Sequence, residues 1–313
     1  MKAILQDLIR LLELERLDTN LFRGESRDIG TRRVFGGQVL GQALAAANYT
    51  TEDRVVHSLH AYFLREGDHG APIIYEVDRQ RDGRSFSSRR VVAIQHGRPI
   101  LNLAASFQRP EEGLEHQAEM PAVPGPEELR DITEYHREVI AGMPAAQVPR
   151  LYLLERPFEF RPVEAPRLLD LEPRPPRQQV WFRAVDRLPD DDLLHRNMLA
   201  YASDYYLLLT ALRPHGLSVF APDLQVASLD HALWLHRPFR IDEWLLYAME
   251  SPNASGARGL SRGQIFRRDG VLVASVAQEG VTRLWTKDRK ARESETKEPD
   301  RRVGRRRQAG GTR

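Results

Sequence analysis

A single acidic residue, Asp204, interrupts an otherwise apolar stretch in the second half of the chain. It lies in Tyr201-Ala202-Ser203-Asp204-Tyr205-Tyr206-Leu207, and we expect it to begin a helix over 205–212. An aspartate at that point commonly caps the helix, because its oxygens accept hydrogen bonds from free backbone N–H groups. A second role for a buried carboxylate there is that of a general base, beside N–H groups that polarise a carbonyl. The residues alone leave both roles open.

Two neutral polar residues follow at the ends of predicted strands. Ser228 lies in Gln225-Val226-Ala227-Ser228-Leu229-Asp230-His231, and Gln278 closes an apolar run over 271–277. A strand hydroxyl or amide commonly bonds only nearby backbone. Taken one at a time, these two residues therefore indicate little chemistry.

A third serine matches a nucleophile motif, since Gly259-Leu260-Ser261-Arg262-Gly263 fits G-x-S-x-G. That motif requires a strand before the serine and a helix after it. Here 264–268 alternates like a strand and runs into a predicted turn at Asp269-Gly270. We therefore expect Ser261 to lie within a strand and not to act as a nucleophile.

Composition excludes several classes of site. The 313 residues include no cysteine, which rules out disulfides, a thiolate nucleophile and a Cys-ligated zinc site. The sequence has no H-E-x-x-H motif, no dense His/Asp cluster and no phosphate-binding glycine loop. We expect neither a metal nor a cofactor.

The net charge of +2 is unevenly distributed. Residues 286–313 hold eleven Lys and Arg against five Asp and Glu in a segment without apolar periodicity, which predicts a disordered, solvated basic tail and no nucleic-acid binding. At the other end, Ile4, Leu5, Leu8 and Leu11 recur at helical spacing, as in an amphipathic helix that packs on the body. Because no apolar run approaches about 18 residues, we expect no membrane insertion.

An internal repeat organises the rest of the chain. Three segments of the first half, over 60–64, 73–75 and 88–97, have counterparts between 171 and 173 residues later. His96-Gly97 and Asp269-Gly270 lie between alternating runs and predict tight hairpins. In the first half, Phe35-Gly36-Gly37-Gln38 begins a small-residue helix suited to burial on nearly all sides.

Each repeat is predicted to place its helix first and antiparallel strands after it, which favours the α+β class. A buried helix wrapped by such a sheet is the hotdog arrangement, so the repeat predicts a double hotdog. We assign 1–108 to the N-terminal repeat with its leading helix, 109–178 to a crossover with a helix near 126–141, 179–285 to the C-terminal repeat, and 286–313 to the tail.

Histidines are the alternative bases. His57, His60, His231 and His236 all flank apolar strand residues. His60 and His231 occupy matching repeat positions, which indicates a shared structural role. His57 is therefore the second choice after Asp204.

The chain resembles the acyl-CoA thioesterase II (TesB-like) family over roughly residues 5–285. The motifs that carry the resemblance stand in family order: Phe35-Gly36-Gly37-Gln38, Tyr62-Phe63-Leu64-Arg65, Tyr201-Ala202-Ser203-Asp204, Asp230-His231-Ala232-Leu233-Trp234, His236-Arg237-Pro238-Phe239 and Gln278-Glu279-Gly280. The tail lies outside the family pattern.

The resemblance implies a double hotdog that hydrolyses medium- to long-chain fatty acyl-CoA, with Asp204, Ser228 and Gln278 as catalytic residues. The family more often has threonine where this chain has Ser228, which keeps the hydroxyl but loses the methyl that restricts its rotamer. The expected mechanism is direct attack by water, with Asp204 as base. The resemblance also implies a cytoplasmic homo-oligomer, a dimer or a tetramer.

Two alternatives share this fold. A hydratase or dehydratase would act on an enoyl thioester and leave CoA attached, and a non-catalytic acyl-CoA-binding protein would release no thiol. The polar trio disfavours the second alternative.

Overall fold

The computed structural model describes residues 1–31, 33–145, 148–166 and 172–285. The tail predicted over 286–313 lies outside the described residues. None of the helices described is both long enough and apolar enough to cross a membrane.

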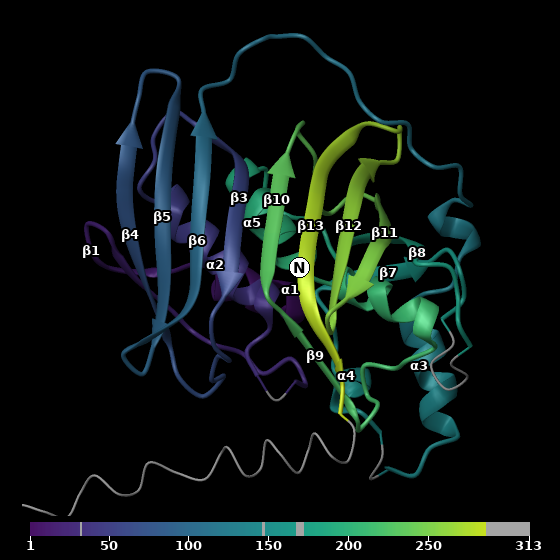
Figure 1. Ribbon diagram of the computed structural model, residues 1–313. Coiled ribbons are helices and arrows are strands. Elements are labelled where there is room, and N and C mark those ends of the chain that lie inside the picture. Colours follow the sequence, from purple (N-terminus) through teal and green to yellow (C-terminus); the bar gives the residue numbers. More distant parts are fainter. Residues whose placement is uncertain (32, 146–147, 167–171, 286–313) are drawn as a thin grey trace, which may run out of the picture.

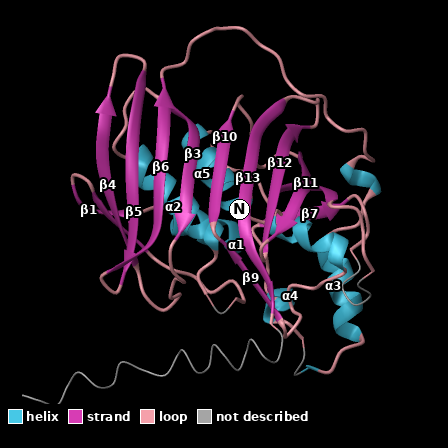
Figure 2. Cartoon of the chain, viewed as in Figure 1, coloured by secondary structure: helices cyan, strands magenta, loops and turns pink. Residues whose placement is uncertain are grey.

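Both halves of the chain contribute strands and helices to one antiparallel sheet and its covering layer (Figures 1 and 2). The first half contains α1 (Ala3–Leu12), β1 (Glu15–Asp18), β2 (Leu21–Gly24), α2 (Gly36–Asn48), β3 (Val55–Phe63), β4 (Ile73–Asp82), β5 (Phe86–Gln95) and β6 (Arg98–Gln108). The connecting segment and the second half contain η1 (Pro126–Glu128), α3 (Ile132–Ala141), α4 (Arg150–Leu153), β7 (Phe158–Pro162), β8 (Arg177–Ala184), α5 (Asp192–Ala202), η3 (Leu208–His215), β9 (Leu224–Ser228), β10 (Asp230–Leu235), β11 (Leu245–Ser255), β12 (Arg258–Arg267) and β13 (Leu272–Leu284).

The strand order is the same in both halves when it is read outward from the centre of the sheet. The described strands follow the order β1-β2-β4-β5-β6-β3-β10-β13-β12-β11-β8-β7, and β9 pairs with the end of β13. The halves join through β3 and β10, where His60 lies opposite Ala232. This duplicated α+β arrangement is the predicted double hotdog.

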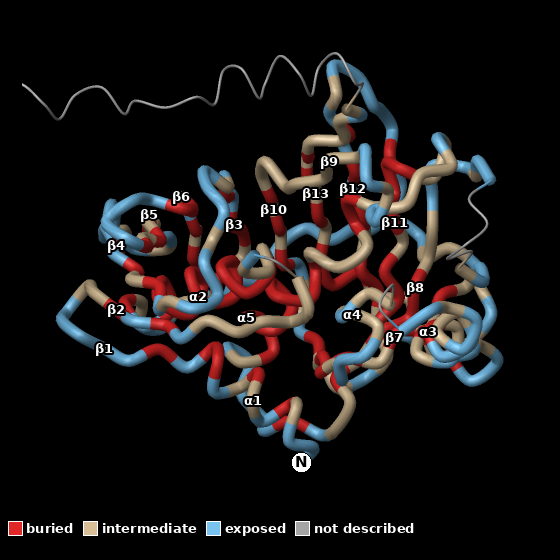
Figure 3. Tube along the Cα trace, turned by 90° about the horizontal axis from the view of Figure 1, so that it is seen from below, coloured by how far each residue is buried: buried red, intermediate tan, exposed pale blue. Residues whose placement is uncertain are grey.

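The two central helices, α2 and α5, pack side by side against one face of the sheet (Figure 3). Residues 37–48 of α2 are all buried. A Cβ atom on Gly37 would lie 2.2 Å from the carbonyl oxygen of Tyr201, and one on Gly41 would lie 3.1 Å from that of Asn197. Glycine is therefore required at Gly37 so that the helices can approach closely, and a side chain at Gly41 would crowd the same contact.

Two local predictions are confirmed. The leading helix α1 buries Leu5, Leu8, Leu11 and Leu12 against the body. Both hairpins turn on a glycine with positive φ, 69° at Gly97 and 86° at Gly270, a conformation that glycine adopts without steric cost.

The predicted position of the second-half helix is wrong. The long helix there is α5, which ends at Ala202, and 205–212 is mostly a 3₁₀ turn that begins at Leu208. Short strands also precede each central helix, so the helix is not the first element of either repeat. The helix predicted near 126–141 is present as η1 and α3.

Arg89, on β5, occupies the interior of the first repeat. Its guanidinium is buried and donates hydrogen bonds to Thr50 Oγ1 and to the carbonyl oxygen of Thr50, each at 2.9 Å. It also lies 2.7 Å from Asp82 Oδ1. Arg89 is paired with Ala105 across β5 and β6, just as Ser261 is paired with Gln278 across β12 and β13. Arg89 and Ser261 are thus both buried residues, on strands that hold the same place in the strand order of the two repeats.

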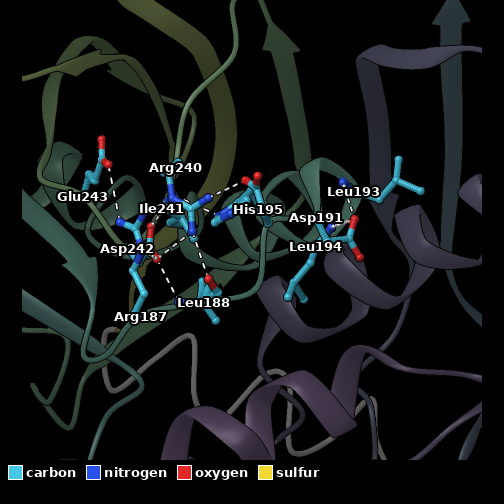
Figure 4. A network of polar contacts seen from close by, with 11 residues as sticks. Arg187, Leu188, Asp191, Leu193, Leu194, His195, Arg240, Ile241, Asp242 and Glu243 are labelled. Atoms are coloured by element: carbon cyan, nitrogen blue, oxygen red, sulfur yellow. Dashed lines mark hydrogen bonds and ion pairs between the residues drawn. The ribbon is translucent and has the colours of Figure 1, made fainter. Parts of the chain in front are cut away.

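A polar network fixes the start of α5 to the loop between β10 and β11 (Figure 4). Asp191 caps the helix by accepting from the N–H groups of Leu193 and Leu194. His195 Nδ1 accepts from the Ile241 N–H at 3.2 Å. In the same loop, the fully buried Asp242 carboxylate accepts from the Leu188 N–H at 2.8 Å and from Arg240 at 3.0 Å.

We predict that Asp242→Ala lowers the free energy of unfolding by about 3 kcal/mol, because it leaves the partly buried Arg240 guanidinium without its buried partner. Thermal and urea unfolding measure the change. Asp190→Ala is the matched control, since Asp190 also pairs with Arg240 but its side chain is 99% exposed. Equal stability of the two variants would contradict a structural role for the buried pair.

Candidate active site

Asp204 lies just after α5 and faces the beginning of the other central helix. Its Oδ2 accepts a hydrogen bond from the Gly37 N–H of α2 at 2.9 Å. The prediction that Asp204 begins its own helix is therefore wrong. The carboxylate does bond a helix N-terminus, but that helix belongs to the first repeat, so the site includes residues from both halves.

The segment that carries Asp204 is fixed on the side of the sheet. The Tyr247 hydroxyl donates to the carbonyl oxygen of Ser203 at 2.9 Å. The Ser203 hydroxyl lies 2.9 Å from His231 Nε2. These buried contacts hold the chain at the residue before Asp204, so the carboxylate does not depend on a flexible loop for its position.

The structure brings the three predicted residues together. Gln278 Nε2 donates to Asp204 Oδ1 at 2.7 Å and to Ser228 Oγ at 2.9 Å. Ser228 ends β9 and lies opposite Gly280 on β13. Because an amide nitrogen carries two hydrogens, Gln278 joins the carboxylate and the hydroxyl with one hydrogen each.

Burial determines the electrostatics of the carboxylate. Removal from water raises the pKa of Asp204, and the hydrogen bonds from Gln278 and Gly37 only partly offset this effect. The side chain is therefore more basic than an exposed aspartate. A carboxylate with a raised pKa is better suited to accept a proton near neutral pH.

A cavity of about 480 Å³ opens beside Asp204 and Ser228. Residues of both repeats line it, including Gly36 and Phe63 from the first and Tyr206 from the second. Gln278 is absent from the lining and is fully buried. Of the three predicted residues, therefore, only Asp204 and Ser228 are positioned to contact a molecule bound in the cavity.

A second, mainly apolar cavity of about 270 Å³ adjoins the first. The two cavities share Leu151, Tyr205, Tyr206 and Leu209. The far end of the second cavity is lined by residues such as Ile132 of α3, Leu212 of η3 and Val219. The connecting segment between the repeats therefore contributes to the interior space next to Asp204.

The alternative residues do not line this cavity. Ser261 lies within β12 and is fully buried, which confirms its predicted place in a strand. His57 Nε2 is 2.8 Å from Ser106 Oγ and does not line the cavity. His60 is exposed whereas His231 is buried, so the expectation that these two histidines share a role is wrong.

Sequence reasoning missed the part played by Gly36 and Gly37 in the site. A Cβ atom at Gly36 would lie 2.7 Å from Asp204 Oδ2, so only glycine allows the carboxylate to approach the helix. The N-terminus of α2 also carries the positive end of the helix dipole. The signal was present in Phe35-Gly36-Gly37-Gln38, but nothing in the sequence connected it to Asp204.

The geometry thus defines a double hotdog in which a carboxylate and a hydroxyl face a cavity formed by both repeats. Two family models match the chain: the acyl-CoA thioesterase N-terminal domain over residues 23–108 and acyl-CoA thioesterase over residues 148–281. The protein belongs to the acyl-CoA thioesterase family and is a thioester hydrolase.

Similar proteins cover nearly the whole fold. Acyl-CoA thioesterase 2 of Haemophilus influenzae is 46% identical over 285 residues, which are 91% of this chain and 99% of the relative. Human acyl-coenzyme A thioesterase 8 is 46% identical over 283 residues, 88% of each chain. The crystal structure of acyl-CoA thioesterase II TesB2 from Mycobacterium marinum has a TM-score of 0.73 and 44% identity, covering 89% of this chain and 99% of that one.

We predict that Gly36→Ala reduces thioester hydrolysis about 10²-fold, because the added methyl group displaces the Asp204 carboxylate. Steady-state assays with an acyl-CoA measure the loss. Gly113→Ala is the control, since a Cβ there meets no heavy atom within 4 Å. Equal activity of both variants would show that the close approach at Gly36 is unimportant.

Proposed function

We propose that this protein hydrolyses medium- to long-chain fatty acyl-CoA to a fatty acid and CoA by direct attack of water, with Asp204 as general base. The observation that carries the proposal is the partly buried Asp204 carboxylate, which borders the cavity and is bonded by Gly37 and Gln278. Ser228 lines the same cavity. Its hydroxyl orients the water, and Gln278 holds both groups.

The reaction needs no acyl-enzyme intermediate. The water oxygen attacks the thioester carbonyl carbon while Asp204 takes a proton from the water. The tetrahedral intermediate then collapses, its carbon–sulfur bond breaks, and the proton on Asp204 passes to the departing sulfur. The first turn of α2 lies beside Asp204 and favours the negative charge that develops on the carbonyl oxygen.

The acyl chain is proposed to extend from the first cavity into the second. Support comes from the shared residues Leu151, Tyr206 and Leu209 and from the largely apolar second chamber. Burial of each methylene group contributes roughly 0.8 kcal/mol. The second chamber therefore favours chains long enough to reach it.

CoA is proposed to bind at the outer part of the first cavity. Arg33 and Arg65 line it and are exposed. Arg33 pairs with Glu66 at 2.7 Å, and Arg65 donates to the carbonyl oxygen of Pro99 at 2.7 Å. Guanidinium groups bind phosphate well, so these two side chains are suited to meet the phosphates of CoA.

The domain division into 1–108, 109–178 and 179–285 and the assembly into a dimer or tetramer remain proposals. The mirrored strand order on either side of β3 and β10 supports two repeats. Among the described residues, no helix of either repeat covers the side of the sheet away from α2 and α5 (Figure 3), which is compatible with assembly through that side. A cytoplasmic location likewise remains a prediction.

The decisive measurement is thiol release from acyl-CoA substrates of several chain lengths. We predict that Asp204→Asn lowers kcat by about 10²- to 10⁴-fold, because the general base is lost. Asp78→Asn, at an exposed position on β4, is the control and should retain full activity. Unchanged thiol release by a folded Asp204→Asn protein would overturn the proposed function, and substrate turnover without thiol release would favour a hydratase.

The same assay at different pH values tests the protonation state. Asp204 acts when ionised, and burial raises its pKa above the ordinary value of 3.8. Activity should therefore fall as the pH decreases through this raised pKa. The neighbouring Tyr201, Tyr205 and Tyr247 have pKa values raised by burial and stay neutral there. If activity fell only at or below pH 3.8, the pH profile would contradict the role of Asp204.

We predict that Val219→Trp shifts the substrate preference towards shorter chains, because the indole fills part of the second cavity. Excluding about two methylene groups should lower kcat/KM for the longest substrates about 10-fold. Short-chain substrates should react as with wild type. Val219→Ala is the matched control and should keep the long-chain activity, whereas equal losses for all chain lengths in Val219→Trp would argue against this acyl path.

A further inference from the structure

Three buried polar atoms on the neighbouring strands β10, β13 and β12 have no hydrogen-bond partner among the described residues. They are Ser261 Oγ on β12, Gln278 Oε1 on β13 and His231 Nδ1 on β10. Ser261 is directly opposite Gln278 in the register of β12 and β13. On the other side of Gln278 lies β10. Ala232 of β10 pairs with Ala277 of β13, and His231 and Gln278 are the next residues along these two strands.

The orientation of the Gln278 amide leaves its oxygen in need of a donor. Both hydrogens of Nε2 are given to Asp204 and Ser228, so Oε1 points away from them. A buried amide oxygen without a donor is costly. If the amide turned over, Oε1 would face the Asp204 carboxylate and repel it. A donor to Oε1 therefore decides whether the catalytic orientation persists.

His231 is not that donor. The Ser203 hydroxyl donates its single hydrogen to the Ala200 carbonyl oxygen at 3.0 Å. His231 Nε2, 2.9 Å from the same hydroxyl, must therefore carry the ring hydrogen and donate to Ser203. Burial lowers the pKa of His231 to about 3, so the ring is neutral and its Nδ1 is an acceptor only.

Ser261 meets the requirement. Residues directly opposite on antiparallel strands have Cβ atoms about 4.5 to 5.5 Å apart, and a serine hydroxyl changes direction by rotation about a single side-chain bond. Both Ser261 and Gln278 are fully buried, so water does not compete freely for either group. The serine in the G-x-S-x-G sequence is thus next to the active site without facing the substrate.

We propose that Ser261 is a positioning residue for thioester hydrolysis: its hydroxyl donates to Gln278 Oε1 and thereby keeps both amide hydrogens on Asp204 and Ser228. This inference rests on the proposed role of Asp204, Ser228 and Gln278. Ser261 acts through Gln278 and contacts neither the thioester nor the water.

The test compares Ser261→Ala, Ser261→Thr and wild type in thiol-release assays across a range of pH. Without the donor, Ser261→Ala should lose about 10-fold in kcat with KM unchanged. The pH below which its activity falls should also be higher than in wild type, because a Gln278 amide that is no longer held in place does not stabilise the ionised Asp204. Ser261→Thr keeps a hydroxyl and should restore both properties, and Ser87→Ala, a buried strand serine of the first repeat, should match wild type.

Two results would overturn the inference. One is a Ser261→Ala enzyme with the kcat and pH profile of wild type. The other is a lower kcat with an unchanged pH profile, which would indicate general disturbance of the strand. Failure of the proposed function looks different, since Gln278→Ala and Asp204→Asn would then retain activity whatever Ser261→Ala does.

Discussion

The hydrogen bond between the Asp204 carboxylate and the Gly37 N–H connects the two halves of the molecule at the point where the chemistry is proposed to occur. This hydrogen bond requires α2 and α5 to pack so closely that only glycine fits between them, and it requires Gly36 to lack a side chain. It also explains why neither repeat contains the site alone. The central helices, their small residues and the junction of β3 with β10 all serve to bring these two groups together.

Removing a carboxylate from water costs free energy, and the partly buried Asp204 has only two hydrogen-bond donors among the described residues to offset that cost. Gly37 and Gln278 supply one hydrogen bond to each oxygen, which offsets only part of the cost of removing the charge from water. A guanidinium in the same place would lower the pKa of Asp204 and weaken it as a base. The protein instead uses neutral donors, so the pKa of Asp204 stays raised while the orientation of its carboxylate stays fixed.

The sequence allowed much of the fold and the members of the site to be predicted, but not their arrangement. Glycine-containing turns such as His96-Gly97 have a strong local signature, and the family resemblance supplied Asp204, Ser228 and Gln278. The helix α5 was missed because its buried residues include Arg196 and Asn197, which bond Val56 and Asn48 and do not follow an apolar period. The apolar run over 205–212 looked more helical than it is, and the link from Asp204 to Gly37 depends on tertiary packing that no local pattern records.

Arg89 makes the interior of the first repeat different from the interior of the second. Two identical repeats would form two equivalent interiors, each with its own helix terminus and its own strand residues. In the first repeat, the buried Arg89 guanidinium on β5 bonds Thr50 and Asp82, whereas the buried side chain of Ser261 on β12 of the second repeat is small. The two interiors therefore differ chemically, and the proposed role of Asp204, Ser228 and Gln278 gives each chain one reaction site.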